Sequence, residues 1–598
     1  MIAVVAATAS GRTAAEALAA AWPDEVRIVA AERVGDALAE AWRTCDAVVS
    51  LLAVGATVRI LAPLLGDKTT DPAVVCVDEA RRYAVALLGG HYGANRLAAR
   101  VAEVLGCEPV VTTASDAAGV TPLDTFGADL GFTIENPGAL ASVGAALLSG
   151  EPVRLVGGDG WPLPPLPPNV VSSKDARDGE AARDGEAART GDGGRGGDLG
   201  PGGPGAAIVI SDRRDPVPAG SVVYRPPSLV IGVGSARGVA VAEVDGLIEE
   251  ALAAAGLHPA ALRCLATVDR KAGEPGIVAA AAGRGLPLVT FPAGLLAEVD
   301  VPNPSEAVRT EVGTPSVAEA AALHAARSYG RGAELVVEKR KSANATVAVA
   351  RLRPRGRLSI VGIGPGARDL LAPRAVAALR RAAVVVGLGQ YVDQVRDLLR
   401  PGTRVLASGL GQEEERARTA VAAASAGQAV ALIGSGDAGV YAMAGPALEL
   451  AGGDIDVDGV PGLTAALAAA SRLGAPLAHD HAYISLSDLN TPWEIIERRV
   501  RAAAEGDFTV CLYNPRSRTR DWQLPKALAI LAEHRPPETP VGYVRNAFRP
   551  GETTTLTTLR DIDPAAIDMF TVVIVGSSHS RTVAGRFVTP RGYPWTSG

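Results

Sequence analysis

The stretch LSIVGIGPGARDLLAPRAVAAL, residues 358–379, indicates the fold of the C-terminal part of this chain. It opens with an apolar run typical of a buried strand and ends with apolar residues at helical spacing. Between the two lie Gly362, Gly364 and Gly366, and glycine allows the backbone to turn sharply where a strand ends. Ligands of open α/β sheets bind at this carboxyl end of the strands. We therefore predict a strand, a ligand-binding turn and a helix.

The glycine-rich turn does not by itself identify a ligand. A turn of this kind also occurs as a tight strand-to-helix connection without a ligand, or as a nucleotide-binding loop. The spacing G-x-G-x-x-G of dinucleotide-binding loops is absent from residues 358–379. A Rossmann dinucleotide site is therefore disfavoured, and other segments must indicate what this turn binds.

The same alternation of strand and helix patterns recurs along the chain, beginning with an apolar strand at residues 2–6 and an alanine-rich amphipathic helix at 13–22. Further strand-like runs lie at 47–52, 73–77, 83–88, 207–210 and 345–350, and helix-like runs lie at 58–65 and 94–105. Strands that alternate with helices favour a mainly parallel sheet covered by helices. The predicted fold class is therefore multidomain α/β.

The length of 598 residues is too great for one hydrophobic core and favours about three to five domains. Between residues 172 and 205 the composition changes to Asp, Gly, Arg, Glu and Ala, and ARDGEA occurs twice in succession. Such a segment buries too little apolar surface to offset its ordering entropy, so we predict a disordered insertion. The predicted divisions are residues 1–125, 126–226 with this insertion, 227–350, a joint at 351–357, and 358–598.

Composition and charge argue against several classes of function. Nucleic-acid binding normally needs basic surfaces and aromatic stacking, whereas this chain has a net charge of −7 and 4% aromatic residues. The five cysteines form no C-x-x-C pair, so we predict neither a metal site nor a disulfide framework. No stretch reaches the roughly 18 apolar residues of a membrane span, and no basic segment precedes the first apolar run. We expect a cytoplasmic protein that binds no membrane.

Six segments after the glycine-rich turn carry a resemblance to a known family. They are SGDAGVYAMAG (435–445), PGLTAALAAASRLGAPLAHD (461–480), SLSDLNTPW (485–493), DFTVCLYNPRSRTR (507–520), VGYVRNAFRPGE (541–552) and VIVGSSHSR (573–581). In this order they resemble the tetrapyrrole methylase family over residues 357–598. Within that family, SLSDLNTPW together with YNPRSRTR is most similar to the precorrin-3B C(17)-methyltransferases.

The resemblance implies both a fold and an activity. Members of this family have two α/β subdomains that flank a cleft, and they are usually homodimers. The implied reaction is S-adenosylmethionine-dependent methylation of a precorrin or cobalt-precorrin at ring carbon 17, coupled to contraction of the macrocycle, in cobalamin (corrin) biosynthesis. A methyltransferase for another tetrapyrrole carbon remains an alternative, and SLSDLNTPW is the segment that discriminates between the two.

The resemblance also implies which residues hold S-adenosylmethionine. They come from the glycine-rich turn and the two segments that follow it: Gly364, Pro365, Gly436, Asp437, Gly439, Val440, Pro461, Thr464 and Ala465. Tyr513 and Asn514 are candidates for contact with either the cofactor or the substrate. Taken alone, GDAGV is also typical of a strand-to-helix turn, and PGLTA of the start of a helix.

Charged groups near these motifs are candidates for substrate binding and proton transfer. A corrin precursor carries many carboxylates, and arginine suits bidentate carboxylate contacts. The candidate arginines are Arg516, Arg518, Arg520, Arg545 and Arg549. Asp488 and His479 are candidates for an acid or base at the macrocycle. The alternative for each is a solvated charge, a helix cap or a buried hydrogen-bonded group.

The N-terminal part resembles a second family of the same pathway. Three segments together resemble cobalt-precorrin-5A hydrolase: AVVSLLAVGATVRILAPLLGDKTTDPAVVCVDEARRYAVALLGGHYGANRLAARVAEVLG (47–106), TVDRKAGEPG (267–276) and NPSEAVRTEVGTPSVAEAAAL (303–323). The activity that this resemblance implies is the opening of a lactone on the ring, with release of a two-carbon fragment as acetaldehyde.

Lactone hydrolysis needs a base for water and donors for the developing oxyanion. His91 follows two glycines and precedes a predicted helix, whose first amides could receive an anion. The catalytic candidates are His91, Lys271 and Glu274, with Lys68, Asp78 and Glu79 in loops near His91. Capping, a surface ion pair or a structural histidine is the alternative for each.

The leading interpretation is a bifunctional enzyme, with a hydrolase-like front part and a methyltransferase behind it. The alternative is that the front part is a non-catalytic module that only binds the macrocycle. Ser235 and Ala236 precede Arg237 where the resemblance predicts a cysteine or an arginine-rich turn. This departure keeps the binding module open as an alternative.

Overall fold

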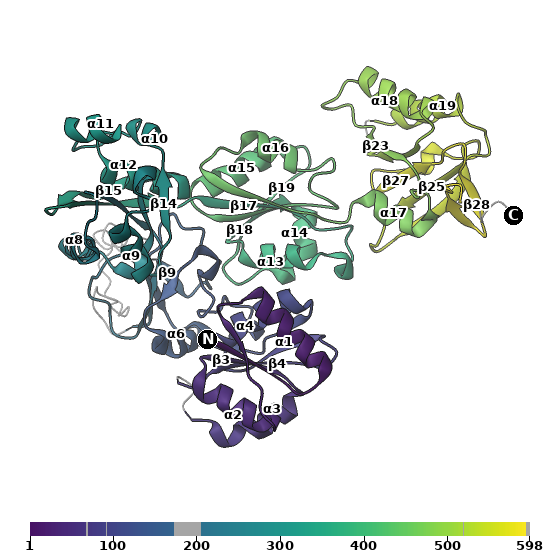
Figure 1. The fold of residues 1–598 in the computed structure, drawn as a ribbon. Helices are drawn as coiled ribbons and strands as arrows, with labels where there is room; N and C mark the ends of the chain where they lie inside the picture. Colours follow the sequence, from purple (N-terminus) through teal and green to yellow (C-terminus); the bar gives the residue numbers. More distant parts are fainter. Residues whose placement is uncertain (67–69, 91–92, 173–204, 518–519, 594–598) are drawn as a thin grey trace, which may run out of the picture. The chain divides into compact units, whose positions relative to one another are not determined.

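The computed structural model describes residues 1–66, 70–90, 93–172, 205–517 and 520–593. These form two compact units, one of residues 1–355 with 400–403 and one of residues 356–399 with 404–598 (Figure 1). Apart from its two end residues, the predicted insertion at 172–205 lies outside the described residues. The predicted joint at 351–357 is mostly strand, because the strands β16 (Ala345–Arg353) and β17 (Gly356–Gly362) leave only Pro354 and Arg355 between them.

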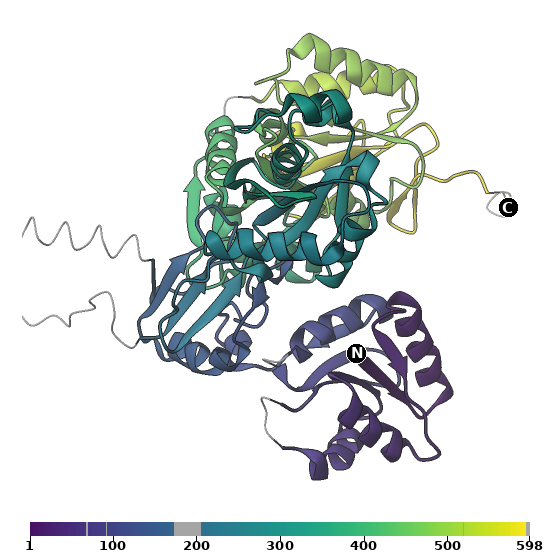
Figure 2. The ribbon, with the colours of Figure 1, turned by 60° about the vertical axis from the view of Figure 1, so that its left-hand side comes forward.

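The first sheet of the N-terminal unit has the strand order β2-β1-β3-β4-β5-β6 and is parallel except where β4 pairs with β5. Its elements are β1 (Ile2–Ala6), α1 (Ala9–Ala21), β2 (Val26–Ile28), α2 (Val34–Thr44), β3 (Ala47–Leu51), α3 (Val54–Leu61), β4 (Ala73–Val77), β5 (Tyr83–Leu88), α4 (Ala94–Leu105) and β6 (Glu108–Val110). Helices α1 and α4 cover one face, and α2 and α3 cover the other (Figure 1). Figure 2 shows this arrangement of helix, sheet and helix from another side.

The second sheet has the strand order β7-β11-β10-β8-β9. Its elements are β7 (Thr133–Ile134), α6 (Leu140–Ser149), β8 (Val153–Gly157), β9 (Val170–Ser172), β10 (Ala207–Ile210) and β11 (Ser221–Arg225). Phe126 and Tyr224 pack edge to face in its core, and the Tyr224 hydroxyl donates to the carbonyl of Leu123 at 2.6 Å. A buried tyrosine hydroxyl normally finds such a partner.

The third sheet has the strand order β14-β13-β12-β16-β15. Its elements are β12 (Leu229–Ser235), α8 (Val241–Ala254), β13 (Leu262–Val268), α9 (Pro275–Gly283), β14 (Leu288–Phe291), α12 (Val317–Tyr329), β15 (Gly332–Lys341) and β16. Helices α8 and α9 cover one face and α12 covers the other. Gly232 permits the close approach of α12, because a Cβ atom there would overlap the carbonyl oxygen of Ala318.

The first sheet of the C-terminal unit has the strand order β19-β18-β20-β17-β21, and all its strands are parallel. Its elements are β17, α13 (Pro373–Arg381), β18 (Val384–Leu388), α14 (Gly389–Val395), β19 (Arg404–Ser408), α15 (Glu413–Ser425), β20 (Ala429–Gly434), α16 (Ala444–Leu450) and β21 (Ile455–Val460). Helices α13 and α14 cover one face and α15 and α16 the other (Figure 1). The glycine-rich turn follows β17, as the sequence predicts.

The second sheet of this unit has the strand order β23-β24-β27-β25-β26 and is mostly antiparallel. Its elements are α17 (Ala465–Leu473), β23 (His481–Ser485), α18 (Trp493–Glu505), β24 (Thr509–Tyr513), α19 (Gln523–Ala532), β25 (Pro540–Arg545), β26 (Thr553–Thr558) and β27 (Thr571–Val575). Helix α17 packs on one face, and α18 and α19 pack on the other. The unit thus contains two α/β subdomains.

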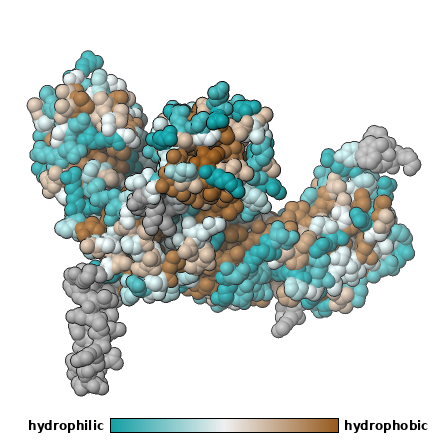
Figure 3. Space-filling model, turned by 90° about the horizontal axis from the view of Figure 1, so that it is seen from below, coloured by the Kyte–Doolittle hydropathy of each residue, from teal (hydrophilic) through white to brown (hydrophobic). Residues whose placement is uncertain are grey.

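The surface in Figure 3 mixes hydrophilic and hydrophobic side chains, drawn in teal and brown. Isolated exposed apolar residues are normal on protein surfaces. In the part of the chain that the structure describes, no helix is long and apolar enough to cross a membrane.

Candidate functional site

Three loops of the C-terminal unit meet at the carboxyl ends of β17, β20 and β21. Gly364 and Gly436 exchange two backbone hydrogen bonds, with N···O distances of 3.0 and 2.8 Å. The third loop fits against them because Gly462 has no side chain, and a Cβ atom there would overlap the carbonyl oxygen of Gly436. Glycine is therefore needed at this junction for the close approach of three backbones.

Asp437 ties two of these loops together. One carboxylate oxygen accepts a hydrogen bond from the amide of Gly439 at 2.8 Å, and the other accepts one from the amide of Gly462 at 3.0 Å. Both oxygens are thus engaged by backbone amides. The structure gives the predicted cofactor ligand Asp437 a role in shaping the junction.

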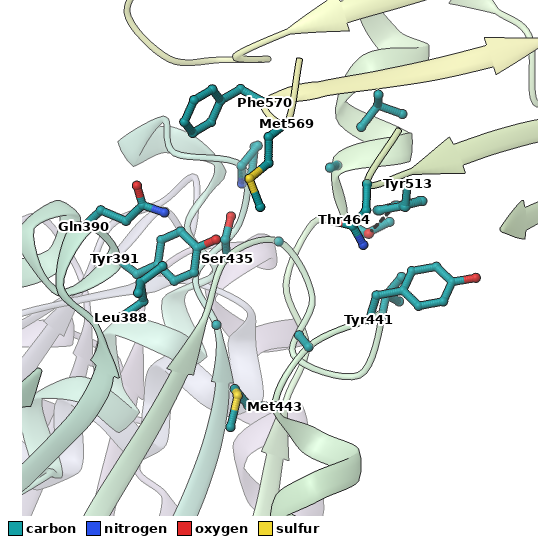
Figure 4. Close-up of a pocket in the computed structure, with 18 of the residues that line it drawn as sticks. Leu388, Gln390, Tyr391, Ser435, Tyr441, Met443, Thr464, Tyr513, Met569 and Phe570 are labelled. Atoms are coloured by element: carbon teal, nitrogen blue, oxygen red, sulfur yellow. Dashed lines mark hydrogen bonds between the residues drawn. The ribbon is translucent and has the colours of Figure 1, made fainter. Parts of the chain in front are cut away.

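A cavity of about 340 Å³ opens beside this junction, with walls from both subdomains (Figure 4). This volume lies within the usual range of small-molecule sites. Leu388, Gln390 and Tyr391 line one side, while Met569 and Phe570 reach it from the loop before β27 (Figure 4). The cavity combines apolar walls with a few polar groups, which is typical of a binding site for an organic ligand.

Most of the predicted cofactor residues line this cavity. Those that do are Pro365, Gly436, Val440, Thr464, Ala465, Tyr513 and Asn514. The others, Gly364, Asp437, Gly439 and Pro461, belong to the loops that form the junction but are not among the lining residues. The structure therefore brings together residues that are separated by up to 150 positions in sequence, from Gly364 to Asn514.

Tyr513 joins the second sheet to the start of α17. Its hydroxyl lies 2.7 Å from the Thr464 hydroxyl and accepts a hydrogen bond from the amide of Ala466 at 2.9 Å (Figure 4). The side chains of Tyr513 and Thr464 are buried, and burial raises the pKa of Tyr513. The phenol therefore stays protonated and acts as a fixed polar group in the cavity wall.

Three residues of the cavity wall have left-handed backbone. Tyr441, Asn514 and Asn546 all line it and have φ angles of 51°, 50° and 51°, in the left-handed region that residues other than glycine seldom occupy. Tyr441 is held there by its hydroxyl, which donates to the carbonyl of Tyr483 at 2.7 Å, and its ring lies 5.2 Å from that of Tyr513. Such strain gathers at functional sites.

Arg549 is the one described arginine among the predicted substrate ligands that lines the cavity. Its Nε donates to the carbonyl of Pro365, and its Nη2 donates to the hydroxyl of Ser435 at 2.7 Å. Burial lowers the pKa of Arg549. Because Arg549 follows β25 and both acceptors follow strands of the first sheet, this side chain bridges the two subdomains.

Three of the other predicted arginines bind protein groups and are not among the residues that line the cavity. Arg516 donates to the carbonyl of Ala565 at 3.0 Å, and Arg545 pairs with Asp568 at 2.7 Å. Arg520 is buried and donates to the carbonyls of Leu486 and Asn514 at 2.9 and 2.7 Å. Arg518 lies outside the described residues.

Neither predicted acid or base of the methyltransferase part lines the cavity. Asp488 accepts a hydrogen bond from the side-chain amide of Gln523 at 2.9 Å and lies 3.9 Å from Arg520. His479 is half-exposed, and its Nδ1 accepts a hydrogen bond from the amide of Asp480 at 2.8 Å. Both side chains have local structural partners.

Sequence reasoning missed Arg416, a buried charged residue of the cavity wall. It lies on α15 with a side chain that is 5% exposed, and it lines the cavity beside Glu413 and Met443. A signal for it exists in the sequence, because Arg416, Ala420 and Ala424 are spaced four apart on the buried face of an alanine-rich helix. An arginine on such a face needs a partner inside the protein or in a ligand.

In the N-terminal unit, the partly exposed Lys271 pairs with the buried Glu274. The Lys271 ammonium donates to one Glu274 oxygen at 2.9 Å, and the amide of Gly238 donates to the other at 2.6 Å. The hydrogen bond from Lys271 lowers the pKa of Glu274 below its ordinary value, against the effect of burial. This carboxylate joins the loops that follow β12 and β13.

The two other described candidates of the front part, Asp78 and Glu79, have simpler surroundings. Asp78 accepts hydrogen bonds from the amides of Arg82 and Tyr83, both at 2.7 Å, as in a turn. Glu79 accepts one from the Thr8 hydroxyl at 2.9 Å. His91 and Lys68 lie outside the described residues.

Four family models match the chain in succession. Cobalamin synthesis G N-terminal matches residues 36–116, Cobalamin biosynthesis central region matches 121–226, and Cobalamin synthesis G C-terminus matches 229–350. Tetrapyrrole (Corrin/Porphyrin) Methylases matches residues 357–563. Both resemblances predicted from the sequence are thereby confirmed.

Individual relatives match the methylase part. A protein of Salmonella typhimurium named probable cobalt-factor III C(17)-methyltransferase is 47% identical over 239 residues, which are 40% of this chain and 99% of the relative. A precorrin-3B C(17)-methyltransferase of Sinorhizobium sp. is 40% identical over 234 residues, 38% of this chain and 91% of the relative. For several other relatives the match covers 45% to 49% of their length.

Among solved structures, the methyltransferase CobJ is 38% identical and covers 39% of this chain and 100% of that chain, with a TM-score of 0.38. The tetrapyrrole methylase model and these relatives match the unit that contains the two α/β subdomains and the cavity described above. The chain therefore belongs to the tetrapyrrole methylase family, among the C(17)-methyltransferases of cobalamin biosynthesis, and carries a cobalamin synthesis G region fused in front of the methylase.

Proposed function

We propose that residues 356–598 transfer a methyl group from S-adenosylmethionine to ring carbon 17 of cobalt-factor III or precorrin-3B. The bond between the methyl carbon and the sulfonium sulfur breaks, and a carbon–carbon bond forms at the macrocycle. S-adenosylhomocysteine leaves as the neutral thioether. Contraction of the ring accompanies this step in the family that the chain resembles.

The observation that carries this proposal is the cavity at the junction of the three glycine-containing loops. Methyl transfer is an in-line displacement, so the protein contributes by aligning donor and acceptor and by excluding water. A preformed cavity with walls from two subdomains suits this task. No covalent intermediate with the protein is needed for the step.

The residues of the cavity fit the cofactor chemically. Gly436, Thr464 and Ala465 present backbone and hydroxyl groups that can bind polar atoms of the cofactor. The rings of Tyr441 and Tyr513, 5.2 Å apart, offer aromatic faces to a sulfonium cation. S-adenosylmethionine bound here would supply the methyl group, while the chain holds and orients both reactants.

Incubating the purified chain with methyl-labelled S-adenosylmethionine and either cobalt-factor III or precorrin-3B tests the proposal. Mass spectrometry and carbon NMR should find the label at carbon 17 of a contracted ring. The substrate that reacts then identifies whether cobalt is present at this step. Label on another carbon would instead support the alternative methyltransferase, and no transfer of label would contradict the proposal.

For the front part we propose hydrolysis of the lactone of cobalt-precorrin-5A, with release of acetaldehyde. The Lys271–Glu274 pair supports a ligand site, because it joins two loops at the carboxyl edge of β12 and β13, where open α/β sheets bind ligands. Enzymatic detection of acetaldehyde from wild-type protein, His91→Ala and Lys271→Met tests this activity. Binding of the macrocycle without acetaldehyde release would favour the non-catalytic binding module.

The proposal extends to assembly and location. We expect a homodimer formed through the methylase part, and light scattering of the purified chain measures its mass.

A cytoplasmic location agrees with the five cysteines, all of which are free, because a reducing compartment keeps thiols reduced. Fractionation of cells that express the chain would test this location.

A further inference from the structure

Arg416 has a buried side chain and lines the methylase cavity. Its side chain is 5% exposed, yet it lines the cavity together with Leu410, Glu413 and Met443. Removing a guanidinium from water is costly unless an anion or several good acceptors receive it. The hydrogen-bond partners of its three nitrogens therefore show whether the protein alone supplies enough acceptors for the buried guanidinium.

Two of the three nitrogens have good acceptors. Nε donates to the Ser408 hydroxyl at 2.7 Å, and Nη2 donates to the carbonyl of Gly409 at 2.7 Å. Both acceptors lie at the end of β19 and just after it, so they fix the plane of the guanidinium against this loop. Both acceptors are also neutral, and neither balances the positive charge.

The third nitrogen, Nη1, has only poor partners in the part of the chain that the structure describes. Its hydrogen-bond acceptor is the Met443 sulfur at 3.5 Å, and a thioether is a weak acceptor. The carboxylate of Glu413 lies 4.0 Å away on a side chain that is 54% exposed. Such a distance is too long for a hydrogen bond, so Nη1 and the charge lack a strong partner.

Nη1 is directed at Met443 and lies near Glu413, and both of these residues line the cavity. An anionic group inside the cavity would give Nη1 the strong acceptor that it lacks. A carboxylate is the acceptor that suits a guanidinium best in geometry and charge. We propose that Arg416 binds a carboxylate of the ligand in the methylase cavity through Nη1. This inference rests on the proposed methyl transfer, in which the methionine part of the cofactor and the side chains of the corrin substrate both carry carboxylates.

Isothermal titration calorimetry on the full chain can test the inference with two variants. Arg416→Met removes the charge and retains much of the side-chain length. Arg418→Met is the matched control, because Arg418 lies on the same helix but is 62% exposed and pairs with Glu414 at 2.6 Å. The ligands are S-adenosylhomocysteine, its decarboxylated analogue, and cobalt-factor III in the presence of S-adenosylhomocysteine.

The two carboxylate sources give different results. If Arg416 binds the cofactor carboxylate, Arg416→Met raises the Kd for S-adenosylhomocysteine about ten- to a hundredfold and leaves that of the decarboxylated analogue unchanged. If it binds a substrate carboxylate, the Kd for cobalt-factor III rises by a similar factor while both cofactor analogues bind normally. In both cases Arg418→Met binds like the wild type.

The inference is overturned if folded Arg416→Met binds S-adenosylhomocysteine and cobalt-factor III within about twofold of the wild type. If Arg416→Met does not fold, Arg416→Gln replaces it, since glutamine is neutral and can still donate to Ser408 or Gly409. The same outcomes then apply. Wild-type protein that binds neither ligand would overturn the proposed methyl transfer itself, which is a different result from an effect limited to the variant.

Discussion

Single side chains hold this site together through hydrogen bonds between distant segments. Tyr513 on β24 reaches Thr464 and Ala466 at the start of α17, and Asp437 reaches Gly462 in the neighbouring loop. Each of these polar groups is wholly or partly buried, so losing one partner leaves the other without compensation. Changes of single residues should therefore affect stability and ligand binding together.

Tyr513→Phe should destabilise the methylase part and weaken cofactor binding. The change removes the hydroxyl that serves Thr464 and the amide of Ala466, and leaving buried groups unpaired costs about 1–3 kcal/mol. Urea denaturation and titration with S-adenosylhomocysteine measure both effects. Tyr543→Phe is the control, since the Tyr543 hydroxyl has no hydrogen bond within the described residues. Equal behaviour of the two variants would show that the bonds of Tyr513 contribute nothing.

Glu274→Gln should reveal a pH-dependent contribution to stability. Because the Lys271 hydrogen bond lowers the pKa of Glu274 below its ordinary 4.5, ionised Glu274 stabilises the fold above pH 4.5. This contribution is lost as the pH falls through the lowered pKa. Calorimetry should find a lower Tm for the variant at pH 7 and a smaller difference from the wild type below pH 4.5. Glu250→Gln, at an exposed position on α8, is the matched control for the loss of one carboxylate. A constant difference between Glu274→Gln and the wild type would contradict the assignment.

At the scale of elements, three strand ends and their loops define the methylase cavity. The loops after β17, β20 and β21 come so close that Gly462 and Gly436 are in direct backbone contact. Parallel strands of one sheet place their carboxyl ends at the same edge, so this convergence follows from the topology. The distance between any two of these loops therefore depends on all three strand ends.

Gly462→Ala should separate these loops and impair the cavity. The new Cβ would overlap the Gly436 carbonyl oxygen, and forcing extra atoms into packed structure costs about 1–3 kcal/mol. Thermal unfolding and titration with S-adenosylhomocysteine should show lower stability and weaker binding. Gly459→Ala on β21 is the control, because nothing lies within 4 Å of a Cβ atom there. If both variants bind normally, the close contact of the loops is not needed for the cavity.

Local patterns predicted the elements well where an apolar run is bounded by turns. Residues 73–77 and 83–88 were predicted as strands and 94–105 as a helix, with the bounds that the structure shows. The antiparallel pairing of β4 with β5 was not predicted, because strand direction depends on contacts far apart in sequence. The predicted joint at 351–357 contains the division between the two compact units, after Arg355, but most of its residues belong to β16 and β17, whose arginines resemble a charged linker.

The cavity could be predicted only in part for the same reason. Its glycines and Thr464 lie in motifs with recognisable turns, whereas Arg416 lies in an alanine-rich helix that resembles a surface helix in composition. The partners of Arg520 and Arg549 are also unpredictable from spacing, because their acceptors lie 6 to 184 positions away. The three-dimensional structure is therefore needed to tell which arginines line the cavity.

At the scale of the whole molecule, each compact unit has its own hydrophobic cores. The methylase unit packs helices on both faces of both of its main sheets. The Salmonella typhimurium relative, which this chain matches over 99% of its length, corresponds to this unit alone. A unit with complete cores can fold without its neighbour.

Residues 356–598 expressed alone should therefore fold and transfer the methyl group. Calorimetry of this fragment should show a cooperative transition, and its rate of labelled-methyl transfer should lie within about threefold of that of the full chain. The full chain measured in parallel is the control. An unfolded or inactive fragment would mean that the methylase depends on the front part for its structure.

The bridge formed by Arg549 also has a consequence for the timing of the reaction. Its guanidinium joins a loop of the second subdomain to Pro365 and Ser435 on the first, across the wall of the cavity. A bulky molecule that enters or leaves past this wall must break those bonds, and opening steps of this kind often limit turnover. Weakening the bridge would then raise the rate of product release and so shorten the residence time of the product. The same change would weaken the binding of the reactants.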